Sequence, residues 1–149
     1  MQKFFLLLFG LGLNLIVLSQ ETISLEKINE KDGLPSDIIN CVFKDSKGFL
    51  WVGSVNGLFR YDGNEFISYA HIPSHKNIIS NNQITSITED SDSNLWVGTT
   101  YGLNRYIPEK DEFNYYLKEP GNKNSLSHSK ISCMMLDSRN NFWVGTRGG

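Results

Sequence analysis

The side chains in this 149-residue sequence that could do chemistry lie in short polar segments. His71 and His75 are four residues apart, a spacing that presents two imidazoles to one metal ion when both lie on a helix. Pro73 lies between them, and no third ligand is evident. We therefore interpret both histidines as surface-loop residues and expect no metal site.

A second candidate, Asp90–Asn94, resembles the start of a calcium-binding loop. Leu95 stands where such a loop requires glycine, and Tyr101 stands where it requires a bidentate glutamate. A turn-forming role is therefore favoured for this segment. No arrangement of nucleophile and base or of paired carboxylates stands out, so we expect no catalytic residue and no cofactor.

These polar turns recur together with three tryptophans, Trp51, Trp96 and Trp143, which are 45 and 47 residues apart. An aspartate stands six positions before each tryptophan and a glycine stands two positions after it: Asp45, Asp90, Asp137, Gly53, Gly98 and Gly145. A fixed period of this length indicates a repeat array. We expect the aspartates to form turns, the glycines to allow neighbouring backbones to approach, and the indoles to fill space between sheets.

Each unit divides into four short apolar runs bounded by Gly, Asn, Asp and Ser, which predicts strands joined by hairpins. In the first two units the runs are Ile39–Lys44, Phe49–Ser54, Leu58–Tyr61, Phe66–Tyr69, Ile84–Glu89, Leu95–Thr99, Gly102–Tyr106 and Phe113–Tyr116. Apolar residues three apart in the first run, such as Ile39 and Val42, could suggest a helix, but six residues are too few. The predicted fold is all-β: a partial β-propeller of about three four-stranded blades, the third incomplete.

The units span about 33–78, 79–125 and 126–149. The second unit is two residues longer between its tryptophan and the aromatic residue of its fourth strand, and we place this insertion in a surface hairpin, Ile107–Glu112. Fewer than three blades cannot close a ring. We therefore expect the rest of a parent chain to be a partner, and the fragment alone to expose sheet edges and to be poorly stable.

The two cysteines occupy the same place in their units, ten residues before Trp51 and Trp143. Equivalent positions one or more units apart in an array lie beyond the roughly 7 Å Cα separation that a disulfide bridges. We expect Cys41 and Cys133 to be small buried residues, not a disulfide.

The first nineteen residues differ from the rest. Lys3 precedes a segment, Phe4–Leu18, that is apolar apart from Asn14, and Val17 and Ser19 suit the −3 and −1 positions of a cleavage site. Residues 1–19 are predicted to be a secretory signal peptide, because the apolar segment is short for a retained membrane anchor. The propeller then occupies residues 20–149. The net charge of −2 and pI of about 5.9 predict no nucleic-acid partner.

The repeat resembles the two-component regulator propeller family. The resemblance covers about residues 23–149, and the segments that carry it are Lys31–Ser36, Asp45–Ser54, Asn56–Gly63, Trp96–Tyr106 and the unit from Ile131 onward. In that family, seven-bladed propellers form the periplasmic sensing region of large sensors, often hybrid histidine kinases of Bacteroidetes that respond to glycan fragments. The resemblance implies the same location and role here, and implies that Ile23–Leu25 pairs as the outer strand of a closing blade.

A second glycine follows each tryptophan by six residues, at Gly57, Gly102 and Gly149. The two positions directly before it vary, as loop tips free for recognition would. Asn56, Tyr101 and Arg147 there offer hydrogen bonds, an aromatic platform and a charge, which suit an oligosaccharide ligand. The function predicted is a non-catalytic, extracytoplasmic ligand sensor that signals to a kinase absent from this chain, with a homodimer as a candidate assembly of the full-length sensor. A propeller enzyme (lyase or glycosidase) and a secreted adhesion or scaffold propeller are the alternatives.

Overall fold

The computed structural model describes residues 27–28, 31, 33–34, 36, 38–72 and 78–148. The predicted signal peptide 1–19, the expected closing strand Ile23–Leu25 and His75 lie outside these residues. No helix in the described ranges has the length and apolar character that crossing a membrane would require.

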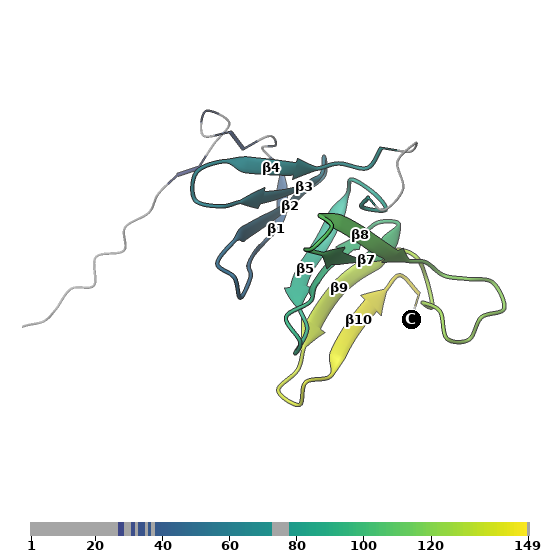
Figure 1. The fold of residues 1–149 in the computed structure, drawn as a ribbon. Coiled ribbons are helices and arrows are strands. Elements are labelled where there is room, and N and C mark those ends of the chain that lie inside the picture. Colours follow the sequence, from purple (N-terminus) through teal and green to yellow (C-terminus); the bar gives the residue numbers. More distant parts are fainter. Residues whose placement is uncertain are drawn as a thin grey trace, which may run out of the picture.

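The described chain is all-β, as predicted, and forms two four-stranded antiparallel sheets and one two-stranded sheet. The strands are β1 (Ile39–Lys44), β2 (Leu50–Ser54), β3 (Leu58–Tyr61), β4 (Phe66–Tyr69), β5 (Ile84–Glu89), β6 (Leu95–Thr99), β7 (Gly102–Ile107), β8 (Glu112–Tyr116), β9 (Ile131–Leu136) and β10 (Phe142–Thr146). In each full sheet the strands follow one another in chain order. The three sheets lie side by side like the blades of an open fan (Figure 1), which is the partial propeller expected.

The three-residue apolar spacing in the first strand of each blade has a structural cause. In β5 the pairing register shifts between Ile84 and Ser86, which leaves Thr85 as a bulge residue. The extra residue places Ile84 and Ile87 on the same face of the strand, although a regular strand would turn them to opposite faces. Equivalent shifts occur in the first and third blades. The apolar spacing of three residues, which resembles a helical period, therefore comes from a bulge in the strand.

The insertion in the second unit lies where predicted along the chain but takes another form. Ile107 and Glu112 form a strand pair at the end of the β7–β8 hairpin, so part of the expected loop is strand. The residues between them form a turn of the same length as the one in the first blade. The insertion thus lengthens two strands by one residue each, because the extra pair continues the existing ladder.

The blades meet through an isoleucine of one blade and a glycine of the preceding blade. A Cβ added to Gly53 would lie 2.6 Å from Cγ2 of Ile84, and one added to Gly98 would lie 2.7 Å from Cγ2 of Ile131. Both isoleucines are fully buried. The glycines are therefore required for the close approach of adjacent sheets.

A small residue pairs with this glycine inside each blade. Cys41 lies opposite Gly53, Ser86 lies opposite Gly98, and Cys133 lies opposite Gly145. Both cysteines are free thiols. Burial raises the pKa of Cys41 to about 11, which keeps the thiol protonated and unreactive. Cys133 is exposed in the described structure, which contradicts the burial expected for it.

Gly98→Ala should lower the free energy of unfolding by about 1–3 kcal/mol, because the added methyl group overpacks the joint against Ile131. Urea unfolding followed by circular dichroism measures this change. The double variant Gly98→Ala/Ile131→Ala is the control, since the second substitution removes Ile131 Cγ2, one of the two nearest atoms that the methyl group meets, and leaves the other, Ser86 Oγ at 2.6 Å. Its destabilisation should be smaller than that of the two single variants added together, and strict additivity would contradict the proposed contact.

Candidate functional site

The repeated aspartates hold the tryptophan side chains. In each blade one carboxylate oxygen accepts a hydrogen bond from the indole Nε1–H, at 2.8 Å for Asp45–Trp51 and 2.7 Å for Asp90–Trp96. The Asp137 carboxylate accepts the same bond at 2.8 Å. The other carboxylate oxygen accepts bonds from the backbone N–H groups two and four residues later. One side chain therefore fixes both the turn and the indole.

The turn between the first two strands is the same in all three blades. The N–H three residues after the aspartate donates to the aspartate carbonyl, and that residue has positive φ: 95° at Gly48, 59° at Ser93 and 62° at Asn140. This geometry is a type I turn followed by a left-handed residue. Glycine and asparagine favour such a position, and in the second blade Ser93 takes it instead.

Hydrogen bonding keeps two of these aspartates ionised. Burial alone would raise the pKa of Asp90, but hydrogen bonds from Trp96 and Asn94 outweigh it and hold the pKa below its ordinary value. For Asp137 the indole of Trp143 is the main cause of a lowered pKa. These carboxylates are structural acceptors rather than general acids, because a general acid at neutral pH needs a raised pKa.

Asp90→Asn should destabilise the fold by about 1–2 kcal/mol at neutral pH, because a charge-assisted hydrogen bond becomes a neutral one. Since the folded-state pKa of Asp90 is lowered, its carboxylate stabilises the fold above about pH 4 and this contribution is lost as the pH falls further. The variant should therefore lose stability less steeply in acid, as measured by urea unfolding across pH.

Asp92→Asn is the matched control for this experiment. Asp92 is an exposed aspartate in the same turn, and only its backbone N–H bonds to Asp90. Its substitution should change stability by less than about 0.5 kcal/mol and should leave the pH dependence as it is. Equal effects of the two substitutions would show that the indole bond is not what Asp90 contributes.

The three predicted ligand residues lie in the turns that follow the second strands, at the opposite end of these strands from the aspartate turns. Tyr101 is 56% exposed, and its N–H donates to the hydroxyl of Thr99 at 3.0 Å. Asn56 is exposed and its N–H donates to Ser54 in the same way, at 2.9 Å. The Arg147 N–H donates to the Lys130 carbonyl at 3.0 Å. The backbone is thus fixed while the side chains remain accessible.

The joint between the first two blades holds a polar network that sequence reasoning did not identify. The Arg60 guanidinium donates to the Tyr106 hydroxyl at 2.8 Å, and Tyr106 donates to the Asp111 carboxylate at 2.6 Å. The Tyr69 hydroxyl donates to the same carboxylate oxygen at 2.7 Å. Burial, together with these bonds, raises the pKa of both tyrosines, so neither ionises at neutral pH. The guanidinium also lies 5.7 Å from the ring centre of Trp51.

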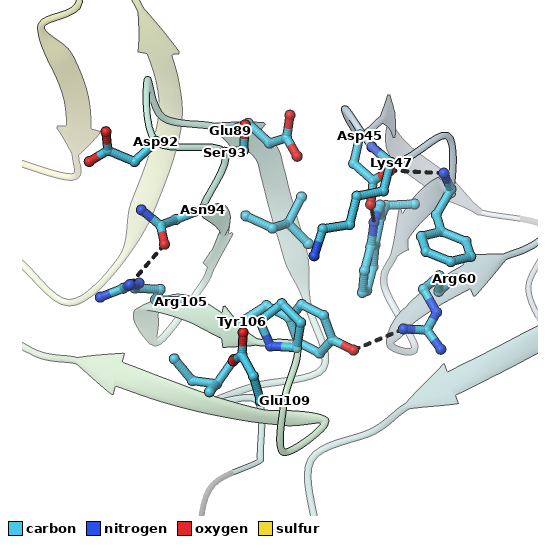
Figure 2. Close-up of a pocket in the computed structure, with 15 residues that line it drawn as sticks. Asp45, Lys47, Arg60, Glu89, Asp92, Ser93, Asn94, Arg105, Tyr106 and Glu109 are labelled. Atoms are coloured by element: carbon cyan, nitrogen blue, oxygen red, sulfur yellow. Dashed lines mark hydrogen bonds between the residues drawn. The ribbon is translucent and has the colours of Figure 1, made fainter.

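A cavity of about 460 Å³ lies next to this network (Figure 2). Its lining comes from both blades and includes the aspartate turns of each: Asp45, Lys47, Phe49, Trp51, Arg60, Glu89, Asp92, Ser93, Asn94, Leu95, Arg105, Tyr106, Ile107, Pro108 and Glu109. In Figure 2, Arg105 is held by the Asn94 side chain, with a hydrogen bond of 2.8 Å. The labelled charges are mixed in sign, and several are committed to bonds within the protein. The cavity therefore presents no single charge to a ligand.

One signal in the sequence could have pointed to this joint. Arg60 and Arg105 stand nine residues after their tryptophans, so they recur as the tryptophans do. The first unit has Glu65 at the turn position of Asp111, so the aspartate is not repeated, and its two tyrosine partners lie on different blades. Among the described residues, no group of three or more His, Cys, Asp or Glu side chains could hold a metal ion. His71 instead contacts the Ile79 carbonyl through Nδ1 at 2.8 Å.

Comparison with known proteins agrees with the repeat geometry. Residues 33–56, 78–101 and 125–148 match the sequence model described as two component regulator propeller. The chain belongs to this two-component regulator propeller family. No curated protein matches the sequence.

Solved structures that resemble the chain include extracellular domains of two proteins assigned as hybrid two-component systems of B. thetaiotaomicron. For BT3049 the TM-score is 0.72 at 26% identity, covering 80% of this chain and 17% of that one. For BT4673 the TM-score is 0.63 at 26% identity, covering 84% of this chain and 18% of that one. This chain thus spans less than a fifth of either structure.

A virginiamycin B lyase from Staphylococcus aureus resembles the chain more distantly. The TM-score is 0.52 at 19% identity, covering 76% of this chain and 36% of the lyase chain. At this identity the likeness concerns the fold alone.

Proposed function

We propose that this chain is an exported, periplasmic ligand-sensing propeller segment of a two-component regulator. The observation that carries the proposal is the similarity to the extracellular domains of two hybrid two-component systems, in addition to the family match. Residues 1–19 act as the signal peptide that places the segment outside the cytoplasm. The segment itself is not catalytic, and a kinase in a longer parent chain supplies the output.

The ligand in this proposal is an oligosaccharide bound on the face that carries the turns after the second strands. Tyr101 supplies an exposed ring on which a sugar ring stacks, and Asn56 and Arg147 supply hydrogen-bond donors in the equivalent turns of the other two blades. Hydroxyl groups of Ser54 and Thr99 support the turns of the first two. A backbone that is ordered before binding reduces the entropic cost of recognition.

The signal in this proposal travels through the joints between blades. The Arg60–Tyr106–Asp111–Tyr69 network joins two blades by bonds of 2.6–2.8 Å, so the blades move together rather than one at a time. Because the segment is rigid, a displacement caused by ligand binding reaches the part of the chain that follows and is not absorbed by local motion.

Tyr101→Ala should weaken oligosaccharide binding about tenfold or more, because the substitution removes the stacking platform without touching the packed sheets. The probe is a panel of neutral and acidic oligosaccharides titrated into the exported chain by calorimetry. Tyr115→Ala is the matched control, since Tyr115 is 53% exposed and lies on the outer strand β8. It should bind as the wild type does.

Two outcomes would contradict the proposal. Equal weakening by both tyrosine substitutions would remove Tyr101 from the ligand face and would indicate non-specific contact of sugars with exposed rings. Cleavage of any oligosaccharide in the panel by the exported chain would favour the enzyme alternative, because a sensor segment releases its ligand unchanged.

A further inference from the structure

The turn that carries Tyr101 is bonded to the segment that enters the second blade. The Thr100 N–H donates to the Gln83 carbonyl at 3.0 Å, and the Thr100 hydroxyl donates to Asn81 Oδ1 at 3.0 Å. Thr100 directly precedes Tyr101 in the chain. Asn81 and Gln83 therefore lie beside the turn that holds the exposed Tyr101 ring, at the same end of the blade.

The amide of Asn81 is oriented by the bonds that it accepts. Its Oδ1 accepts the Thr100 hydroxyl and also the Gln83 N–H, the latter at 2.8 Å. Only the oxygen of an amide accepts hydrogen bonds, so the NH2 group is left for another partner, and it makes no hydrogen bond within the described chain. Gln83 is exposed, and its side-chain amide likewise has no partner among these residues. Two unpaired amides thus lie next to one exposed aromatic ring.

Buried polar groups hold the entering segment and the turn together. The Ser80 N–H donates to Asn104 Oδ1 at 2.8 Å, and the Ser80 and Thr99 hydroxyl oxygens are 3.1 Å apart. The Thr99 oxygen also accepts the Tyr101 N–H. Thr99 and Asn104 are fully buried, and Ser80 is buried as well. The backbone beneath the ring and the amides is therefore fixed before a ligand arrives, which lowers the entropic cost of binding.

The other two blades lack this combination of side chains. The equivalent positions hold Ser36, Ile38 and Asn56 in the first blade and His128, Lys130 and Gly148 in the third. Phe59 stands in the first blade where the second has the buried Asn104. The second blade packs against a sheet on either side, and Tyr101 is still 56% exposed, so its accessibility does not come from either end of the chain.

We propose that Tyr101, Asn81 and Gln83 form a subsite for one neutral pyranose unit of an oligosaccharide. The inference rests on the ligand-sensing function proposed above and assigns its specificity. The C–H face of the sugar stacks on the Tyr101 ring. The Asn81 NH2 group donates to one sugar hydroxyl, and the Gln83 amide bonds a neighbouring hydroxyl.

The subsite selects a neutral sugar because none of its three side chains carries a charge. A uronate or sulfate group placed there would give up its water for neutral amide donors alone. Hydrogen bonds to an anion are strongest from charged donors such as guanidinium groups, and the subsite has none. A neutral hydroxyl, in contrast, exchanges a bond to water for an equivalent bond to an amide.

Calorimetric titration of the exported full chain with a neutral oligosaccharide and with its uronic-acid counterpart of the same length tests the subsite. The neutral compound should bind about tenfold more tightly, because the charged one loses water without gaining a charged partner. Gln83→Ala should weaken binding of the neutral compound about fivefold, the loss expected for one neutral hydrogen bond. Gln83 is exposed, so folding should be retained, as circular dichroism will show.

Asn114→Ala is the matched control, since Asn114 is an exposed amide on the outer strand β8 and should bind the neutral compound as the wild type does. The double variant Tyr101→Ala/Gln83→Ala shows whether both residues contact the same sugar unit. If they do, its affinity should fall by less than the product of the two single losses, because the sugar that Gln83 contacts has already lost its platform. Strictly multiplicative losses would overturn the shared subsite.

Two further results would overturn the inference and leave the sensor function standing. One is a Gln83→Ala variant that binds like the wild type while Tyr101→Ala is weakened. The other is a uronic-acid counterpart that binds as tightly as the neutral compound or more tightly. If the wild type binds no oligosaccharide at all, the sensor proposal itself fails and the subsite fails with it, so the two kinds of failure give different results.

Discussion

The structure depends on the close approach of adjacent sheets at their second strands, where only a hydrogen atom fits beneath the next blade. Gly53 and Gly98 supply that hydrogen, and a buried isoleucine occupies the space above each of them. Sheets that pack at this spacing exclude water from the apolar residues around the joint. Two other repeated features place these partners: the bulge turns the isoleucine toward the glycine, and the small residue across the strand pair leaves the glycine accessible.

The hydrogen bond between the repeated aspartate and tryptophan organises the residues around this joint. The indole covers the space beside the joint, but its N–H would be an unsatisfied donor if it were buried without a partner. An aspartate side chain in the preceding turn satisfies this donor and two backbone N–H groups at once. The same residue therefore determines the hairpin and the orientation of the aromatic ring, which explains why aspartate and tryptophan keep a separation of six residues in all three units.

The fold was predictable from the sequence because packing repeats. Trp51, Trp96 and Trp143 each lie in the same local sequence, and a repeat array gives such residues the same turn and the same bond to aspartate. The role of Asp90 was predicted only in part: its bonds to the turn follow from local sequence, whereas its bond to Trp96 requires the hairpin to bring the two side chains together. Asp111 could not be found at all, since one of its tyrosine partners lies 42 residues away and the aspartate is not repeated. The ligand role of Asn56, Tyr101 and Arg147 stays a prediction.

The unequal exposure of chemically identical indoles has a practical consequence. Trp51 is enclosed at 1% exposure and Trp143 faces solvent at 58%, yet each donates to an aspartate at 2.8 Å. Their bonds to aspartate are therefore matched, whereas Trp51 also packs against Tyr69 of its own blade and Tyr106 of the second blade. The fluorescence of these two tryptophans therefore reports on blade stacking. A dissolved quencher reaches Trp143 first, and it reaches Trp51 only when neighbouring blades separate.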